Sequence, residues 1–280
     1  MMLTMRFPGG LGKALTFSYD DGVEQDAELI RILDEHGMKG TFNLNSGLYA
    51  PEGHKWPAGQ VHRRMTRKAC MALYGGSGHE VAVHCLTHAS LPELPQSAMV
   101  TEIMEDRANL ERDFGGVIRG MAYPFGTYND AAVEALRCCG VLYARTVIST
   151  HRFDIPQDWM RLPATCHHDD PLLMSLADRF LTERTTYGSK LFYLWGHSYE
   201  FEDKKNWDVM VRFCDKMANH PEIWYATNGE IHDYLEAARQ IRSTVNGSRI
   251  FNPTATPLCL EVCGENLLLP PGGTLSLPAI

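Results

Sequence analysis

Short apolar runs alternate with amphipathic stretches over the first 240 residues of the chain. Residues 13–19 (KALTFSY) form a β-branched and aromatic run that predicts a strand, and residues 24–36 then carry apolar side chains at helical spacing until Gly37. The alternation continues with predicted strands at 40–44, 80–84, 117–122, 190–197 and 223–227, and predicted helices at 66–74, 97–114, 129–139, 172–181, 207–218 and 229–241. This rhythm predicts parallel strands joined by right-handed crossovers.

The predicted fold is therefore α/β, with about seven parallel strands arranged as a (β/α) barrel. From residue 243 the helical spacing stops, and short β-like runs are broken by Asn246-Gly247 and by a Pro-Pro-Gly-Gly sequence. We expect the barrel to comprise residues 1–242 and a small β-rich C-terminal appendage to comprise residues 243–280.

Charge and hydropathy exclude several classes of partner. The formal charge is −8 and no run of Lys and Arg is present, so the electrostatic attraction needed for nucleic acid or an anionic membrane is missing. No segment has the pattern of a signal peptide or the length of a membrane span. The expectation is a cytoplasmic protein with no membrane partner, in which the eight cysteines are reduced thiols. The oligomeric state is not determined by these features.

Titratable side chains follow three of the predicted strands. Asp20 and Asp21 follow the first, His84 and His88 follow the third, and His197 follows the strand 190–196. In a (β/α) barrel the carboxyl ends of the strands meet at one face, so these five residues are expected to converge. Two imidazoles and one carboxylate are a common ligand set for a catalytic divalent metal, which leaves the second carboxylate to act as a base.

Each of these motifs also has an ordinary structural explanation. Asp-Asp-Gly is commonly a turn, and a histidine within an apolar strand is commonly a satisfied core residue. The spacing of His84 and His88 would place both on one face of a helix, although the Glu of the zincin motif is missing. The sequence His167-His168-Asp169-Asp170 has the composition of a second metal site, but Asp170 is explained as a helix cap. The combination at one barrel end favours a catalytic site.

Five motifs in order resemble those of the polysaccharide deacetylase family, also called the NodB-homology family or family-four carbohydrate esterases. They are TFSYDDG, GHEVAVHCLTH, AYPFGTYN, DWMRLPAT and LWGHS, and the resemblance covers roughly residues 13–241. The family fold is a distorted (β/α) barrel, in agreement with the pattern of strands and helices. The resemblance implies that Asp20 is the general base and that Asp21, His84 and His88 bind the metal.

The third motif departs from the family. Its backbone N–H after the proline would hold the oxyanion, which assigns this role to the Phe125 amide. The arginine that normally begins this motif is replaced by Ala122 or Tyr123. Its pairing with the base is therefore not evident, and Arg145 or Arg161 is a candidate to substitute for it from another strand.

The fourth and fifth motifs supply the remaining site residues. The resemblance implies that His197 is the general acid and that apolar neighbours wall the acyl pocket. Trp195 is expected to line that pocket, Asp158 matches the fourth motif, and Tyr123 and His168 are further candidates for substrate contact.

The function predicted from these residues is metal-dependent hydrolysis of an N-acyl group on an amino sugar or polysaccharide. The cofactor would be one divalent metal, with zinc favoured and cobalt, nickel or manganese as alternatives. Two other hypotheses stay open. One is an amidohydrolase that acts on a small non-sugar amide or imide, and the other is a catalytically silent carbohydrate-binding barrel in which the missing arginine marks lost chemistry.

Overall fold

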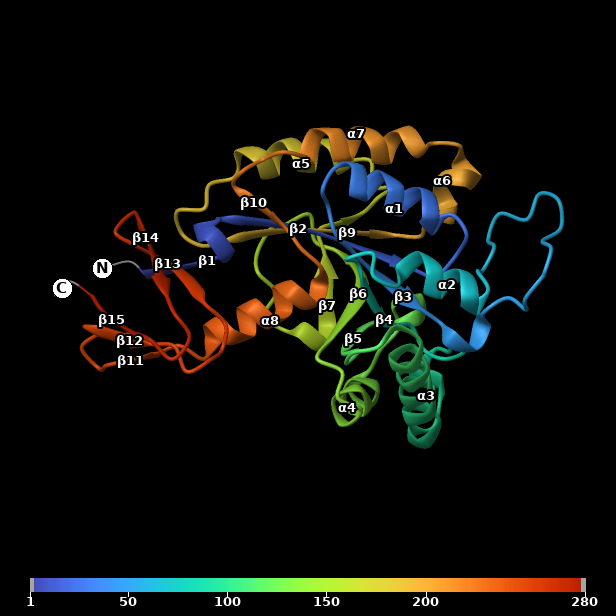
Figure 1. The fold of residues 1–280 in the computed structure, drawn as a ribbon, viewed down its shortest axis with the longest axis horizontal. Helices are drawn as coiled ribbons and strands as arrows, with labels where there is room; N and C mark the ends of the chain where they lie inside the picture. Colours follow the sequence, from blue (N-terminus) through green and yellow to red (C-terminus); the bar gives the residue numbers. More distant parts are fainter. Residues whose placement is uncertain (1–2, 278–280) are drawn as a thin grey trace.

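The computed structural model describes residues 3–277 and places them in a (β/α) barrel with a smaller β region at one end (Figure 1). Parallel pairing runs through the sheet in the order β7-β6-β5-β4-β3-β2-β9-β8, and β10 pairs with β2. The bounds are β2 Lys13–Asp20, β3 Gly40–Leu44, β4 Glu80–Val83, β5 Gly120–Ala122, β6 Tyr143–Ser149, β7 Leu162–Ala164, β8 Cys166–His167, β9 Lys190–Gly196 and β10 Ile223–Tyr225. The predicted fold class is confirmed.

One continuous segment closes the barrel. β7 pairs with β6, and β8, which begins two residues after β7 ends, pairs with β9 at the other end of the sheet order. Between them, the Thr165 N–H donates to the Tyr193 carbonyl over 2.8 Å. β7 and β8 thus together take the place of one barrel strand. This distorts the barrel but leaves the carboxyl ends of the strands on one face.

Helices cover the outside of the barrel. They are α1 Asp26–Glu35, α2 Arg67–Tyr74, α3 Gln96–Phe114, α4 Asp130–Cys138, α5 Leu173–Thr182, α6 Tyr199–Lys204, α7 Trp207–Met217 and α8 Asn228–Arg239. α7 contacts both α1 and α5 on one side, and α3 contacts α2 and α4 on another (Figure 1). The helices predicted at 97–114 and 172–181 correspond to α3 and α5.

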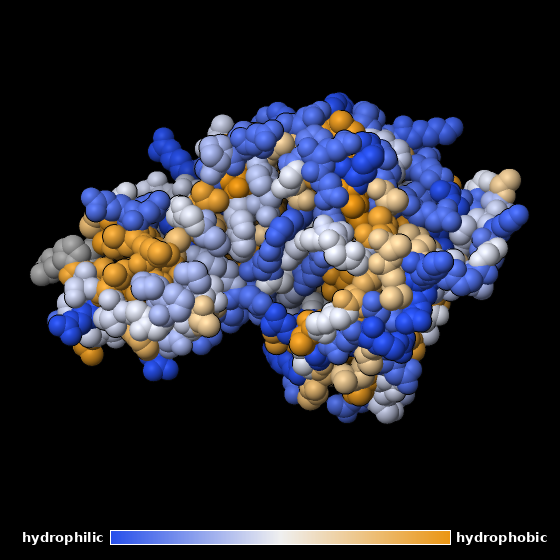
Figure 2. Space-filling model, viewed as in Figure 1, coloured by the Kyte–Doolittle hydropathy of each residue, from blue (hydrophilic) through white to orange (hydrophobic). Residues whose placement is uncertain are grey.

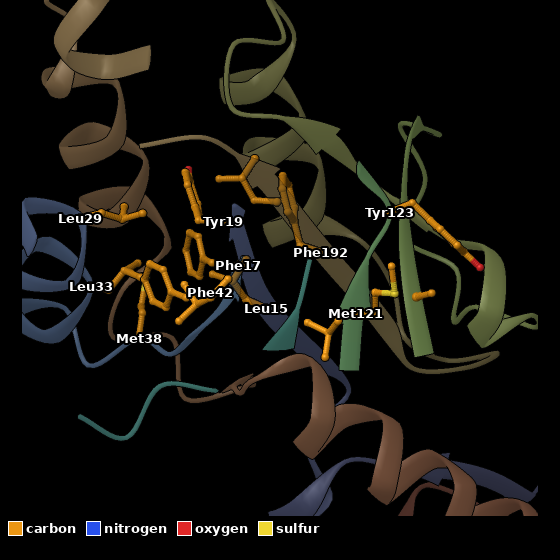
Figure 3. Close-up of a cluster of buried hydrophobic side chains, with 14 of the residues drawn as sticks. Leu15, Phe17, Tyr19, Leu29, Leu33, Met38, Phe42, Met121, Tyr123 and Phe192 are labelled. Atoms are coloured by element: carbon orange, nitrogen blue, oxygen red, sulfur yellow. The ribbon is translucent and has the colours of Figure 1, made fainter. Parts of the chain in front are cut away.

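The main core lies between the strands and these helices. Phe17 of β2 and Phe42 of β3 are fully buried and pack with Leu33 of α1, as Figure 3 shows. Every residue of β2 is buried, as expected for a parallel strand covered on both faces. This burial fixes the strand whose last residue is Asp20.

The tail forms antiparallel sheets, and one of them includes the start of the chain. β1 (Leu3–Arg6) pairs with β13 (Leu258–Val262), which pairs with β14 (Glu265–Leu269). β11 (Arg242–Ser243), β12 (Arg249–Phe251) and β15 (Thr274–Ser276) form the second sheet. The N-terminal strand is therefore attached to the tail, which the sequence pattern did not indicate. Apolar side chains gather on the visible face of this region (Figure 2).

Two further observations concern the cysteines and the helices of the described residues. None of the eight cysteines forms a disulfide within residues 3–277. Within residues 3–277, none of the helices combines the length and the apolar character needed to cross a membrane.

Candidate metal and catalytic site

Asp21, His84 and His88 converge at the carboxyl ends of β2 and β4. Asp21 directly follows β2 with a φ of 86°, and His84 directly follows β4. One potential ligand atom from each residue lies within 4.8 Å of the others. The Oδ1 atom of Asp21 is 3.8 Å from the Nε2 atom of His88. The structure therefore brings the three predicted metal ligands together.

The segment that carries His84 and His88 is a turn, so the helical geometry expected from their spacing was wrong. Cys85 has a φ of 63° and His88 a φ of 58°, which are left-handed conformations that no α-helix contains. Asn45 holds this turn by donating from its Nδ2 atom to the Cys85 carbonyl over 2.7 Å and to the His84 carbonyl. The conformation of this turn, rather than helical periodicity, brings the rings of His84 and His88 together.

Hydrogen bonds set the tautomer of His84. Its Nδ1 atom lies 2.7 Å from the Ala122 carbonyl, so this nitrogen carries the proton and the Nε2 lone pair is free. Burial lowers the pKa of His84, and it lowers the pKa of His88 to about 4, although Asp21 opposes both shifts. Both rings are thus neutral near pH 7, as metal binding requires.

Asp21 is held from two sides by basic side chains. Its Oδ2 atom lies 3.1 Å from His62 Nε2, and its Oδ1 atom accepts a hydrogen bond from Arg64 over 2.9 Å. Burial would raise the pKa of Asp21, but the His62 hydrogen bond and the nearby His84 and Arg64 side chains outweigh it and lower the pKa well below its usual range. An ionised carboxylate beside two neutral imidazoles is a donor set that fits a divalent cation.

Asp20 is more deeply buried, and its Oδ2 atom lies 3.8 Å from His84 Nε2. Arg145 Nη2 donates to both of its carboxylate oxygens, with 2.5 Å to Oδ1, and Asn43 Nδ2 donates to Oδ1 over 2.8 Å. Burial raises the pKa of Asp20, but the Arg145 charge and the nearby His84 and His197 rings reverse this and lower it. Asp20 is therefore held as an ionised carboxylate despite its burial.

Arg145 supplies the positive charge that the third motif lacks. It lies on β6 directly opposite Ala122 of β5, the position where the family's arginine was expected. Its side chain is fully buried, and its guanidinium carbon lies 4.4 Å from the centre of the Trp195 ring. An arginine on the next strand thus takes the place of the one expected at the third motif. Arg161, the other candidate, forms exposed pairs with Asp130 and Asp158.

His197 follows β9 and completes the group. Its Nε2 atom is 3.8 Å from Asp20 Oδ2, and its Nδ1 atom is 3.1 Å from Glu200 Oε1. Burial would lower the pKa of His197, but the Glu200 hydrogen bond and the carboxylates of Asp20 and Asp21 raise it. The ring is thus suited to carry a proton near neutral pH.

Phe125 projects beside the metal ligands. Its φ is 58°, its ring lies edge-on to His88 with centroids 4.5 Å apart, and its side chain is 64% exposed. Within residues 3–277, no hydrogen bond uses the Phe125 N–H as donor. The left-handed backbone therefore leaves this amide free beside the site.

The four residues expected to contact substrate have different surroundings. Trp195 meets the expectation best, since its ring lies edge-on to His197 with centroids 5.8 Å apart. Tyr123 is buried and donates to the Met160 carbonyl over 2.8 Å, and in Figure 3 its hydroxyl points away from the main cluster. Asp158 caps a short turn by accepting from the Met160 N–H over 3.0 Å. His168 is fully buried against Glu200. Tyr123 and Asp158 are thus engaged in structural contacts.

Sequence reasoning missed three polar residues of the site. Glu200 lies three residues after His197, the spacing of neighbours on a helix, and this signal was present in the sequence. His62 and Arg64 come from the long connection between β3 and α2, which protrudes from the barrel in light blue in Figure 1. Nothing in their local sequence indicates that this connection returns to Asp21.

Comparisons with known proteins agree with the motifs. Residues 10–144 match the sequence model of a family described as polysaccharide deacetylase. An uncharacterized protein of Streptomyces coelicolor is 27% identical over 124 residues, a stretch that covers 44% of this chain and 44% of that protein. The matched stretch thus spans less than half the length of this relative. The family resemblance drawn from the motifs is confirmed.

Solved structures share the fold at low identity. A Mycobacterium smegmatis protein assigned to the polysaccharide deacetylases is 15% identical, with a TM-score of 0.58 over 85% of this chain and 95% of that one. The Xyl-CE4 domain of a multidomain xylanase from the hindgut metagenome of Trinervitermes trinervoides is 11% identical, with a TM-score of 0.53 over 80% and 92% of the two chains. At these identities the similarity concerns the barrel architecture alone.

Proposed function

We propose that this chain, which matches the polysaccharide deacetylase family over residues 10–144, is a metal-dependent hydrolase that removes an N-acyl group from an amino sugar or polysaccharide. One observation carries the proposal. Three groups meet at one end of the barrel. They are the possible metal ligands Asp21, His84 and His88, the carboxylate of Asp20 paired with Arg145, and the imidazole of His197 paired with Glu200. Amide hydrolysis needs these three capacities, because the water must be activated, a proton accepted and the amine protonated.

Asp21, His84 and His88 would hold one divalent ion, for which zinc is the best match among the candidates. Such an ion polarises an acyl oxygen and lowers the pKa of water from about 15.7 toward ~7. The protein prepares the site for it through the proton that the Ala122 carbonyl fixes on His84 Nδ1, which leaves Nε2 as the ligand atom.

Asp20 serves as the general base in this proposal. Arg145 and Asn43 hold its carboxylate in one orientation and keep it ionised despite its burial. Asp20 accepts the proton of the attacking water, and the Arg145 charge limits its basicity. This pairing supports a catalytic barrel over a silent one, since the charge missing from the third motif is present on the neighbouring strand.

In this proposal the Phe125 amide stabilises the developing oxyanion. Its N–H has no acceptor among the described residues, and its ring contacts that of His88. A fixed backbone donor at a developing negative charge contributes about 2.7–4 kcal/mol in other hydrolases. The exposed Phe125 ring also offers an apolar surface for the C–H face of a sugar.

His197 delivers the proton to the departing nitrogen. An amine cannot leave as an anion, so this step requires an imidazole that is protonated in the working pH range. The contacts with Glu200 and Asp20 raise the pKa of His197, and activity should therefore fall as pH rises through that raised value.

The experiment that tests the proposed function is a substrate screen with the metal-loaded protein. Acetate release is measured with N-acetylglucosamine oligomers of increasing length and, in parallel, with small non-sugar amides and imides. Release from the oligomers supports the sugar deacetylase assignment. Turnover of the small amides alone would replace it with the amidohydrolase hypothesis, and the absence of turnover on both classes would reject a hydrolytic function on amides.

A further inference from the structure

A second group of titratable side chains lies next to His197 and outside the five residues predicted from the motifs. It consists of His167 and His168 at the end of β8, Asp169 directly after them, and Glu200 in the first turn of α6. One potential ligand atom from each lies within 4.8 Å of the others. Asp170, the fourth residue of the His-His-Asp-Asp sequence, is engaged elsewhere by the Leu172 N–H and by His151.

Glu200 is the centre of this group. Its Oε1 atom lies 3.1 Å from His197 Nδ1. Its Oε2 atom lies 2.9 Å from His168 Nε2 and 3.3 Å from His167 Nε2. One carboxylate, 19% exposed, thus faces nitrogen atoms of three imidazole rings.

The hydrogen-bond pattern disfavours a metal ion at this group. His167 Nδ1 accepts the Asp169 N–H over 3.1 Å, so the proton of the neutral ring is on Nε2, the atom that faces Glu200. A protonated ring nitrogen cannot bind a metal. Asp169 in turn is paired with the Lys204 ammonium, whose charge repels a cation. His167 is thus not available as a ligand and Asp169 is already paired with a cation, which leaves too few ligands for a typical protein site.

Besides Glu200, the Oδ1 atom of Asp169 lies near His168, 3.7 Å from its Nε2 atom, and the ring has little freedom to move. Its ring is fully buried and stacks on Phe201 with centroids 4.1 Å apart and on Tyr19 with centroids 5.7 Å apart. No described residue makes a well-formed hydrogen bond to either of its ring nitrogens. The close approach of Nε2 to Glu200 Oε2 is therefore its main polar interaction, and it favours a negative charge on Glu200.

We propose that Glu200 is the positioning residue of the general acid. Glu200 accepts the Nδ1 proton of His197 and thereby directs the other ring nitrogen, Nε2, toward Asp20 and the reacting amide. The His167 and His168 rings lie against the opposite oxygen of Glu200, with their Nε2 atoms 3.3 and 2.9 Å from Oε2. The inference rests on the proposed function, since it extends the role of His197 as the acid that protonates the leaving amine.

The groups that face His197 are consistent with this role. Asp20 and Asp21 approach from the end of β2, Glu200 from α6 and His167 from β8, where the His167 and His197 ring centroids are 6.3 Å apart. Trp195 and Tyr199 border the ring with apolar surface. Among these groups, Glu200 alone contacts Nδ1, so it alone determines which nitrogen faces the substrate.

The test compares two substrates whose leaving groups differ in whether they must be protonated. An amine must be protonated to leave, whereas 4-nitrophenolate leaves from 4-nitrophenyl acetate without a proton. In the Glu200→Gln variant, we expect acetate release from the best N-acetyl substrate to fall by about 100-fold or more in kcat, and ester hydrolysis to fall far less. A general disturbance of the site would lower both reactions alike.

A matched control and a second variant complete the experiment. Glu202→Gln changes the same helix, but Glu202 pairs with Arg63 and Gln25 rather than with His197, so its ratio of amide to ester activity should equal that of the wild type. If Glu200→Gln does not fold, His167→Gln removes one contact to Glu200 and should lower the same ratio by a smaller factor.

Three outcomes would overturn the inference. One is an equal loss of amide and ester activity in Glu200→Gln. Another is a second bound metal ion that is lost in Glu200→Gln but kept in His84→Ala, which would assign the group to a cation. The third is a wild-type protein that cleaves the ester but no amide. This last result rejects the proposed function itself, whereas the first two leave that function intact.

Discussion

Asp20 stays ionised in a buried site because Arg145 donates hydrogen bonds to both of its carboxylate oxygens. Neither residue is more than 3% exposed in its side chain. Removal of one partner from a buried ion pair costs about 3–5 kcal/mol, because the remaining charge is left without compensation. The pair therefore links the stability of the barrel to the protonation state of the proposed base.

Replacement of Arg145 tests this link. Without the guanidinium, burial dominates and the pKa of Asp20 rises, so Arg145→Met should shift the acidic limb of the activity profile to higher pH and lower the free energy of unfolding by about 3–5 kcal/mol. The measurements are kcat/KM against pH and denaturant unfolding. Arg161→Met is the control, since its pairs are exposed and should contribute no more than about 1 kcal/mol. An unchanged acidic limb in Arg145→Met would contradict the assigned role.

A second pair of substitutions distinguishes the role of the base from that of the metal ligands. Asp20→Asn should lose about 10²–10⁴-fold in activity and keep its metal, because Asp20 lies outside the group formed by Asp21, His84 and His88. His84→Ala should lose both metal and activity. Metal analysis and acetate release on the two variants check this difference, and an active Asp20→Asn protein would refute the base assignment.

At the scale of elements, strand ends were easier to predict than the loops that join them. Apolar runs placed Asp20 and His197 correctly because a buried parallel strand is a continuous pattern that ends where polar residues begin. The turn at His84 and the connection carrying His62 depend on backbone conformations and long-range contacts that leave no periodic signal. Arg145 could be named only as one of two alternatives, because register between neighbouring strands is not visible in the sequence.

The end of β9 gives a prediction at this scale. A Cβ on Gly196 would lie 2.0 Å from His168 Nδ1, and Gly196 has no left-handed φ that would itself demand glycine. Gly196→Ala should therefore displace His168 and cost about 1–3 kcal/mol, with a loss of activity. The control is Gly40→Ala on β3, where the nearest side-chain atom is 3.3 Å away and a smaller loss is expected. Equal melting temperatures for the two variants would show that this close approach is not needed.

For the molecule as a whole, the sequence predicted the barrel and the site at its carboxyl end but not the way the barrel closes. About seven barrel strands follow from the alternation of strands and helices. Residues 162–167 pair with β6 on one side and with β9 on the other, and this pairing depends on tertiary packing. The attachment of β1 to the tail is a contact between the two ends of the chain, which no local pattern reveals. The division at residue 242 stays a prediction.

The measurement that tests the central claim most directly is metal content of the purified protein, combined with acetate release before chelation, after chelation and after metal is restored. The account predicts about one divalent ion per chain and acetate release from an N-acetylated sugar that is lost and regained with the ion. A protein that binds no metal, or one whose acetate release is unaffected by complete metal removal, would contradict it.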